Sequence, residues 1–246
     1  MIFINLITFA QVSSKTKMWC GTQDKQAREY FDSGNFGLEN HLLKQSKSLF
    51  IAAVKIDPNF CDAWDNLSVC CKRMGLYDEA FNAGLRSVMI DSTNPVAWMN
   101  CGYASFLNND IYKALTSFDH LQRIIPNNPE GYYGKSLVLY SIDSIAEARF
   151  NLIKAIQSYK ANKIKKGSEV QLLLGFIEYK SGNINEAQKI FKKIYPKHID
   201  NAELNYYLGK CIQITGGREN LNLANSYIER GITLGYVNKN ETIQNK

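Results

Sequence analysis

Apolar and small residues recur at helical spacing in paired segments of about a dozen residues along most of the chain. Short breaks separate the two segments of a pair, for example at positions 74–76, 108–109 and 181–183. We therefore expect breaks near residues 75, 109, 143, 182 and 216. The pattern predicts an all-α chain of twelve helices in antiparallel pairs, with no β-sheet.

Equivalent residue types return at a fixed distance. The spacing is 34 residues in three series, namely Trp64, Trp98 and Tyr132; Ala80, Ala114 and Ala148; and Gly175 and Gly209. The step from Ser136 to Gly175 is 39 residues, so five extra residues enter near 160–167, where we expect a longer second helix or an ordered loop. Three further extra residues enter near 216–220, since Ala187 and Ala224 are 37 residues apart and the regular spacing is 34. A pair of helices cannot bury its apolar faces alone, so stacked repeats are predicted.

These residues resemble the tetratricopeptide-repeat (TPR) motif W-x2-L-G-x2-Y…A-x3-F…P. The matching positions are Trp64 with Leu67, Trp98 with Gly102, Ala114 with Phe118 and Pro126, Leu174-Gly175 with Ala187 and Phe191, and Leu208-Gly209. The resemblance covers residues 22–237, although the first unit matches only loosely because 38–56 is long for one second helix. It implies a right-handed superhelical solenoid of about six helix pairs. The implied function is a non-catalytic scaffold that binds a peptide or protein segment in its concave groove.

The resemblance also indicates which positions of each first helix face the groove. The candidates for partner binding are Asn66, Met99, Asn100, Tyr103, Phe106, Tyr133, Tyr140, Phe176, Tyr179 and Tyr206, with Tyr207 and Lys210 beside them. Asn66 and Asn100 occupy the same position in successive units, so their amides could hold the backbone of an extended peptide. The alternative is that the aromatic residues fill the packing between helices. If they bind a ligand, their rings should be partly exposed.

The net charge and its distribution say little about which partners the chain binds. The net charge is +6, and ten lysines between Lys154 and Lys197 face three glutamates. This basic stretch lacks the arginine density and aromatic interleaving of a nucleic-acid surface, so we expect a solvated face and no nucleic-acid partner. The clamp by which some TPR proteins bind a chaperone's terminal carboxylate needs Lys at position five and Asn at position nine. Asp65 and Val69 stand at these positions in the second unit, which disfavours that role.

Candidate catalytic and metal-binding residues are few. The three histidines have no metal-ligand spacing, and no G-x-S-x-G or phosphate-binding loop is present. We therefore expect no enzyme, cofactor or metal. The six cysteines show no C-x2-C pair and are interpreted as small core residues, which favours a reducing compartment.

The N-terminal segment suggests a different location. Residues 1–14 are apolar with small residues at Ala10 and Ser14, typical of a short signal peptide, although no basic side chain precedes them. We expect export to the periplasm or beyond, slightly ahead of a cytoplasmic location. The alternative is an apolar helix that caps the fold. A linker at 15–21 and a polar tail at 238–246 complete the prediction, and no transmembrane span is expected. A structural subunit that assembles through its convex or terminal surfaces is the alternative to groove binding.

Overall fold

The computed structural model describes residues 19–165 and 167–237, and these ranges are helical with no strand. The helices are α1 (Lys25–Glu39), α2 (Leu43–Ile56), α3 (Cys61–Arg73), α4 (Tyr77–Ile90), α5 (Pro95–Leu107), α6 (Ile111–Ile124), α7 (Pro129–Ser141), α8 (Ile145–Ala161), α9 (Glu169–Lys180), α10 (Ile184–Ile194), α11 (Ala202–Thr215) and α12 (Leu221–Thr233). The predicted all-α class, the twelve helices and the five breaks are confirmed.

The 34-residue period is visible in the backbone of the hairpin turns. One residue with positive φ follows each first helix, at His41 (61°), Gly75 (76°), Asn109 (61°), Asp143 (62°), Gly182 (81°) and Gly217 (67°). Glycine, asparagine and aspartate tolerate this left-handed conformation best. The turn at His41 corrects the expectation for the first unit, because α2 begins only at Leu43 and has an ordinary length of 14 residues. The first unit is therefore in phase with the others.

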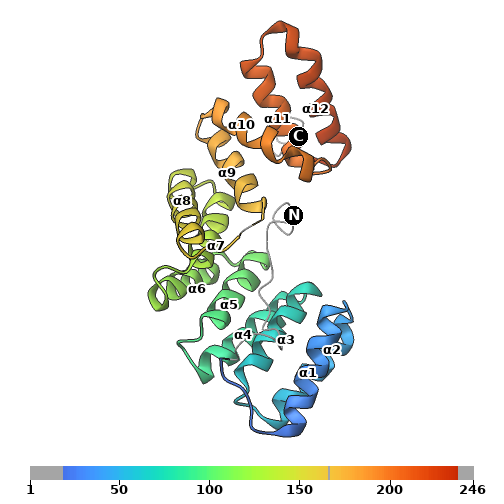
Figure 1. The fold of residues 1–246 in the computed structure, drawn as a ribbon, viewed down its shortest axis with the longest axis vertical. Helices are drawn as coiled ribbons and strands as arrows, with labels where there is room; N and C mark the ends of the chain where they lie inside the picture. The colour runs from blue at the N-terminus through green and yellow to red at the C-terminus, as the bar shows by residue number, and fades with distance from the viewer. Residues whose placement is uncertain (1–18, 166, 238–246) are drawn as a thin grey trace, which may run out of the picture. The chain divides into compact units, whose positions relative to one another are not determined.

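The described chain forms two compact units that meet inside α7, one ending at Val138 and one beginning at Leu139. In the N-terminal unit, helices α1 to α6 pack in chain order, each on the next. In the C-terminal unit, α8 to α12 do the same. Figure 1 shows the antiparallel pairs within each unit. At 17 residues, α8 is the longest of the described helices, which confirms the lengthening predicted near residue 160.

Close approach of the two helices of a pair depends on small residues. In three units a phenylalanine ring of the second helix lies directly over a glycine of the first. A Cβ atom would stand 2.7 Å from a ring carbon at Gly34 (Phe50), 2.7 Å at Gly102 (Phe118) and 2.4 Å at Gly175 (Phe191). Each pair is 16 residues apart, and the rings are fully buried. The repeated glycine and phenylalanine therefore fix the spacing of the hairpins.

The proposed signal segment 1–14 and the tail 238–246 lie outside the described residues, as does most of the 15–21 linker. Within the described ranges, no helix has both the length and the apolar character needed to cross a bilayer.

Candidate functional site

A row of polar side chains lies along the first helices of the N-terminal unit. Asn66 of α3 donates from Nδ2 to Oδ1 of Asn35 in α1 at 2.6 Å. Asn100 of α5 donates to the carbonyl oxygen of Asp65 at 3.3 Å and accepts from Nζ of Lys72 at 2.8 Å. All five side chains are buried. We call Asn35, Asp65, Asn66, Lys72 and Asn100 the polar row.

Two atoms of the polar row have no hydrogen-bond partner among the described residues, namely Nδ2 of Asn35 and Oδ1 of Asp65. The other carboxylate oxygen of Asp65 accepts from Nδ2 of Asn94 at 2.8 Å. Burial raises the pKa of Asp65 to about 7 and lowers the pKa of Lys72 to about 7. Sequence reasoning identified Asn66 and Asn100 but missed Asn35 and Lys72. The one signal for Lys72 is that it follows the apolar run Val69-Cys70-Cys71 in α3.

The predicted aromatic groove residues of the N-terminal unit are buried. Tyr103 is only 1% exposed, contacts Phe118 edge-on at 5.2 Å between ring centroids, and donates its hydroxyl to Glu130 Oε2 at 2.9 Å. The candidates Met99, Phe106 and Tyr133 are also buried. The partial exposure expected of ligand-binding rings is therefore not found at Tyr103 and Tyr133, because they fill the packing between helices.

The C-terminal unit contains a cluster of tyrosines from three segments. Tyr179 of α9 packs on Tyr207 of α11 at 4.7 Å, and Tyr206 stacks on Tyr236 at 4.0 Å with the planes 22° apart. We call Tyr179, Tyr206, Tyr207 and Tyr236 the tyrosine cluster. All four side chains are partly exposed. Tyr179 and Tyr206 therefore have the partial exposure that the groove prediction requires.

Two further predicted candidates lie beneath the tyrosine cluster. The rings of Tyr140 and Phe176 are 6.4 Å apart, and Phe176 lies 5.6 Å from Tyr207. Both are buried, so Tyr140 also lacks the expected exposure. Burial raises the pKa of the Tyr140 and Tyr207 hydroxyls above their usual range, so these groups stay protonated. Tyr236 was not among the predicted residues, since it follows the last helix and no repeat position indicates it.

The interpretation of the six cysteines as small core residues does not hold for Cys20, which is partly exposed, whereas Cys61 is buried but not a free thiol. Cys20 and Cys61 form a disulfide with their Cα atoms 5.6 Å apart. The Asp62 carboxylate accepts the backbone N–H groups of Trp19 and Cys20, each at 3.0 Å. The disulfide therefore fastens the segment before α1 to the start of α3. Spacing alone could not predict the pairing. The other four cysteines are free and buried, as expected.

One group of possible metal ligands occurs among the described residues, with donor atoms of Cys61, Asp62 and Asp65 within 4.8 Å of one another. Cys61 is oxidised in the disulfide and Asp62 binds two backbone N–H groups. A disulfide sulfur offers no thiolate, which is the form of cysteine that binds metals. In this state the group anchors the N-terminal segment.

A hollow of about 610 Å³ opens on the second-helix side of the N-terminal unit. It is lined by Pro58, Asn59, Trp64, Arg86, Met89 and Ile90. Trp64 donates its indole N–H to the Pro58 carbonyl at 3.0 Å. One repeat later Trp98 bonds the Ser92 carbonyl at 2.8 Å in the same way, but its ring is covered by stacking on His120 at 4.2 Å.

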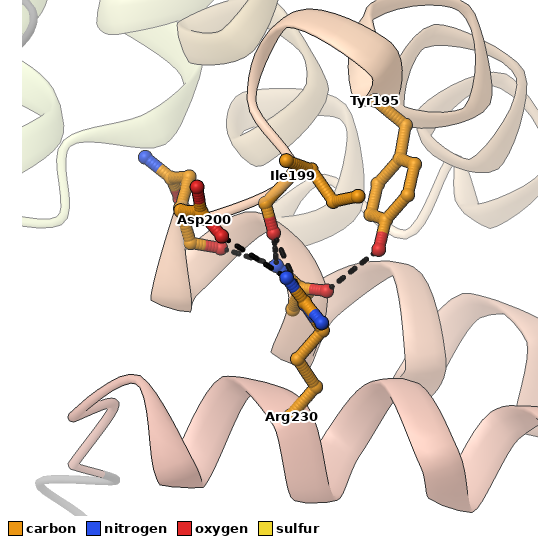
Figure 2. Close-up of polar contacts among 6 residues, drawn as sticks. Tyr195, Ile199, Asp200 and Arg230 are labelled. Carbon is orange, nitrogen blue, oxygen red and sulfur yellow. Dashed lines mark hydrogen bonds and ion pairs between the residues drawn. The ribbon is translucent and has the colours of Figure 1, made fainter.

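The connection between α10 and α11 is held by side chains of two helices (Figure 2). Arg230 of α12 donates to the Ile199 carbonyl at 3.2 Å and to Asp200 at 3.0 Å. Asn205 of α11 donates to the Ile199 and Asn201 carbonyls, each at 2.8 Å, and accepts from the Tyr195 hydroxyl at 3.2 Å. These bonds fix the loop that carries the chain into α11.

A second hollow of about 440 Å³ lies at this loop, lined by Leu172, Lys197, His198, Ile199, Asp200 and Asn201. Nε2 of His198 lies 2.5 Å from the Ser168 hydroxyl. A serine nucleophile needs a base that a third group orients. The nearby carboxylate of Asp200 is bonded to Arg230, so it does not supply that group here.

Comparison with known proteins agrees with the repeat pattern. No family model matches the chain. A TPR repeat-containing protein of Methanocaldococcus jannaschii is 32% identical over 144 residues, which are 58% of this chain and 24% of that protein. Tetratricopeptide repeat protein 37 of Xenopus laevis is 26% identical over 143 residues, 54% of this chain and 9% of its own length. The chain thus spans a quarter or less of these two relatives.

Solved structures show the same architecture. PilF of Pseudomonas aeruginosa superposes with a TM-score of 0.72 at 17% identity, covering 91% of this chain and 99% of its own. A chain of the APC/C hetero-tetramer Cut9–Hcn1 gives 0.73 at 14% identity, covering 85% and 40%. YrrB, a TPR protein with an unusual peptide-binding site, gives 0.56 at 17% identity, covering 76% and 92%. The predicted resemblance is confirmed: this chain has the tetratricopeptide-repeat fold and is similar in sequence to TPR proteins, a family of generally non-catalytic scaffolds.

Proposed function

We propose that the chain is a non-catalytic scaffold that binds a segment of another protein along the face formed by its first helices. The observation that carries this proposal is the pair of unsatisfied atoms in the polar row. Asn35 Nδ2 is a buried donor and Asp65 Oδ1 a buried acceptor, and neither has a partner among the described residues. Buried polar groups are almost always paired, because an unpaired one costs about 1–3 kcal/mol. Both atoms are buried, so the first helices must part slightly before an extended backbone, which offers both a carbonyl and an N–H, can bind this pair.

The exposed groove candidates of the C-terminal unit support binding on the first helices of that unit as well. Tyr179 and Tyr206 stand on first helices of the C-terminal unit with part of each ring exposed. A tyrosine gives a large contact area at a low cost in side-chain entropy. By analogy, YrrB is a TPR protein with a peptide-binding site. We also propose that nucleic acid is not a partner, since the basic stretch of the second half lacks the features of such a surface.

An Asn35→Asp variant tests the proposal. The substitution keeps an oxygen for the bond from Asn66 but replaces the unpartnered NH₂. Asn82→Asp, an exposed change of equal charge on α4, is the matched control. Partners captured from the native host are quantified by mass spectrometry against each variant. A partner lost at least tenfold with Asn35→Asp and retained with Asn82→Asp supports groove binding, and one retained by both contradicts it.

A second candidate function is a structural subunit that assembles through its second-helix surface. The observation that favours it is the exposure of large apolar side chains on second helices, with Met89 69% exposed, Tyr112 80% and Phe150 60%. By analogy, a chain of similar fold occurs in the APC/C hetero-tetramer Cut9–Hcn1. Met89→Glu and Tyr112→Glu should then abolish assembly in size-exclusion chromatography of native extracts. Unchanged assembly would leave groove binding as the working model.

Export of the chain is also a proposal. The Cys20–Cys61 disulfide supports it, because such bonds persist mainly in oxidising compartments. The test is a count of free thiols in protein from envelope and cytosolic fractions of the native host, alkylated on lysis. Four free thiols and an N-terminus after Ala10 or Ser14 in the envelope fraction support export. Six free thiols and an intact Met1 in the cytosol would refute it.

A further inference from the structure

We propose that Tyr179, Tyr206 and Tyr207 of the tyrosine cluster form a binding site for a tyrosine side chain of a partner segment, and that Tyr236 of this chain occupies the site in the free protein. This inference rests on the proposed groove function and adds the chemistry of one subsite. It concerns only residues of the C-terminal unit.

The position of Tyr236 shows what the site accepts. Its ring stacks on Tyr206 at 4.0 Å and meets Tyr207 edge-on at 5.8 Å. Its hydroxyl lies 3.4 Å from the Tyr207 hydroxyl. The site therefore contacts both the face and the polar end of the ring. A phenylalanine would make only the first of these contacts, so tyrosine is the preferred occupant.

The walls of the site come from the groove side of the first helices. Tyr206 and Tyr207 stand at positions five and six of α11, and Tyr179 packs against Tyr207 from α9. These are the positions that the TPR resemblance assigns to the groove. Tyr236 comes instead from the segment that follows α12, and so it enters the site from outside the first-helix register.

The connection of Tyr236 to the fold is short and permissive. Gly235 has a φ of 96°, and the Tyr236 N–H bonds the Gly231 carbonyl at 2.9 Å, which closes one turn after α12. A glycine in this conformation ends a helix and turns the chain back. Rotation at this turn would release the ring while α12 stays packed on α11. Only one side chain needs to leave before an external tyrosine can enter.

The short connection between α12 and Tyr236 determines the affinity that an external segment needs in order to displace Tyr236. A side chain held by a short linker has an effective concentration in the millimolar range. An external segment must therefore bind more tightly than this to replace Tyr236. Removing the Tyr236 ring removes the competitor, so affinity for an external tyrosine should rise. A purely structural role for Tyr236 predicts no such gain.

The test uses the full chain and a synthetic peptide of residues 231–242 as the probe. Binding is followed by 1H–15N NMR titration of wild type and the Tyr236→Ala variant. We expect Tyr236→Ala to bind the peptide at least tenfold more tightly, with the largest shifts at Tyr206 and Tyr207. The same peptide with alanine at position 236 should not bind. Tyr77→Ala, which alters a partly exposed tyrosine of the N-terminal unit, should behave as wild type.

A Tyr236→Phe variant keeps the proposal testable if the alanine variant unfolds locally. It keeps the ring and loses the hydroxyl contact, so the peptide should bind between twofold and tenfold more tightly than to wild type. Equal binding by wild type and both variants, or shifts confined to other residues, would overturn the inference. Loss of the native partner with Asn35→Asp, together with no peptide binding, would leave the groove function standing without this subsite. Peptide binding to the Tyr236→Ala variant, with no native partner captured by the wild-type chain, would support the tyrosine subsite and contradict the proposed groove function.

Discussion

The two units use the same repeat positions for different chemistry. Positions five and six of the first helix hold Asp65 and Asn66 in the second repeat, and Tyr206 and Tyr207 in the last. In the N-terminal unit these side chains are fully buried and hydrogen-bonded, with one carboxylate oxygen of Asp65 left without a partner among the described residues. In the C-terminal unit they are partly exposed and packed on other rings. The glycine and phenylalanine positions that fix the helix pairs recur in both units, so the scaffold leaves the groove positions free to vary.

The two units can be followed separately. All three tryptophans, Trp19, Trp64 and Trp98, lie in the N-terminal unit, so tryptophan emission reports that unit. The tyrosine cluster lies in the C-terminal unit and contributes to near-ultraviolet circular dichroism. The predictions below run from the largest expected effect to the smallest.

Loss of the disulfide should destabilise the N-terminal unit most. The Cys20–Cys61 bond spans 41 residues and encloses α1 and α2. Closing a loop of this length stabilises a fold by about 4 kcal/mol in the chain-entropy model. We expect Cys20→Ser to lower the free energy of unfolding by up to that amount in urea titrations followed by tryptophan emission. A reducing agent should lower the stability of wild type and leave that of Cys20→Ser unchanged; an equal response would contradict the role of the bond.

The buried carboxyl of Asp65 should make the stability of the N-terminal unit depend on pH. Its folded pKa of about 7 lies above its usual value of 3.8, so between these pH values the folded state binds more protons than the unfolded state. The resulting stability is fully present below pH 3.8 and is lost as the pH rises through about 7. The slope is at most about 1.4 kcal/mol per pH unit. Lys72 acts oppositely above pH 7, because its folded pKa of about 7 lies below its usual 10.5.

An Asp65→Asn variant isolates this contribution. It removes the titrating group, so the difference in unfolding free energy between wild type and variant should change between pH 4 and pH 7 and stay flat above. Tryptophan-monitored urea titrations at four pH values measure it. A difference that does not vary with pH would show that Asp65 keeps an ordinary pKa.

The helix pair of the last repeat should tolerate a methyl group less than its counterpart in the N-terminal unit. A Cβ at Gly209 would stand 2.7 Å from the backbone oxygen of Ala224, whereas the three atoms nearest to a Cβ at Gly102 all belong to the side-chain ring of Phe118. Backbone cannot rotate aside, so α12 itself must move. We expect Gly209→Ala to cost about 1–3 kcal/mol, more than Gly102→Ala. Urea titrations with circular dichroism compare the two, and a larger loss at Gly102 would reverse the argument.

The sequence predicted the scaffold well because its determinants are local and periodic. The 34-residue spacing, the breaks and the small residues opposite phenylalanine rings all follow from helix geometry and close packing. The site was predicted less well. Burial of Tyr103 and Tyr133 depends on neighbouring helices, which a helix register alone does not describe. The Cys20–Cys61 bond and the return of Tyr236 onto α11 involve segments outside the repeats, where no periodicity guides a prediction.

The smallest expected effect concerns the loop that enters α11. The Tyr195 hydroxyl donates to Oδ1 of Asn205, a fully buried amide whose nitrogen holds two carbonyls of the loop. Tyr195→Phe removes one of these bonds and leaves the ring contact with Tyr227 at 5.2 Å. Tyr195 is partly exposed, so water can replace the hydroxyl, and we expect a loss of about 0.5–1.5 kcal/mol in thermal unfolding.

Tyr227→Phe is the matched control for that variant, since it changes the ring partner without touching the Asn205 amide. Its melting temperature should equal that of wild type. A loss above about 2 kcal/mol for Tyr195→Phe would mean that water does not reach Asn205 and that the amide behaves like the buried polar row of the N-terminal unit. The two units would then differ in their aromatic side chains, but buried amides would be inaccessible to water in both. A small loss keeps the contrast, because buried polar atoms would remain closed to water in one unit and open to it in the other.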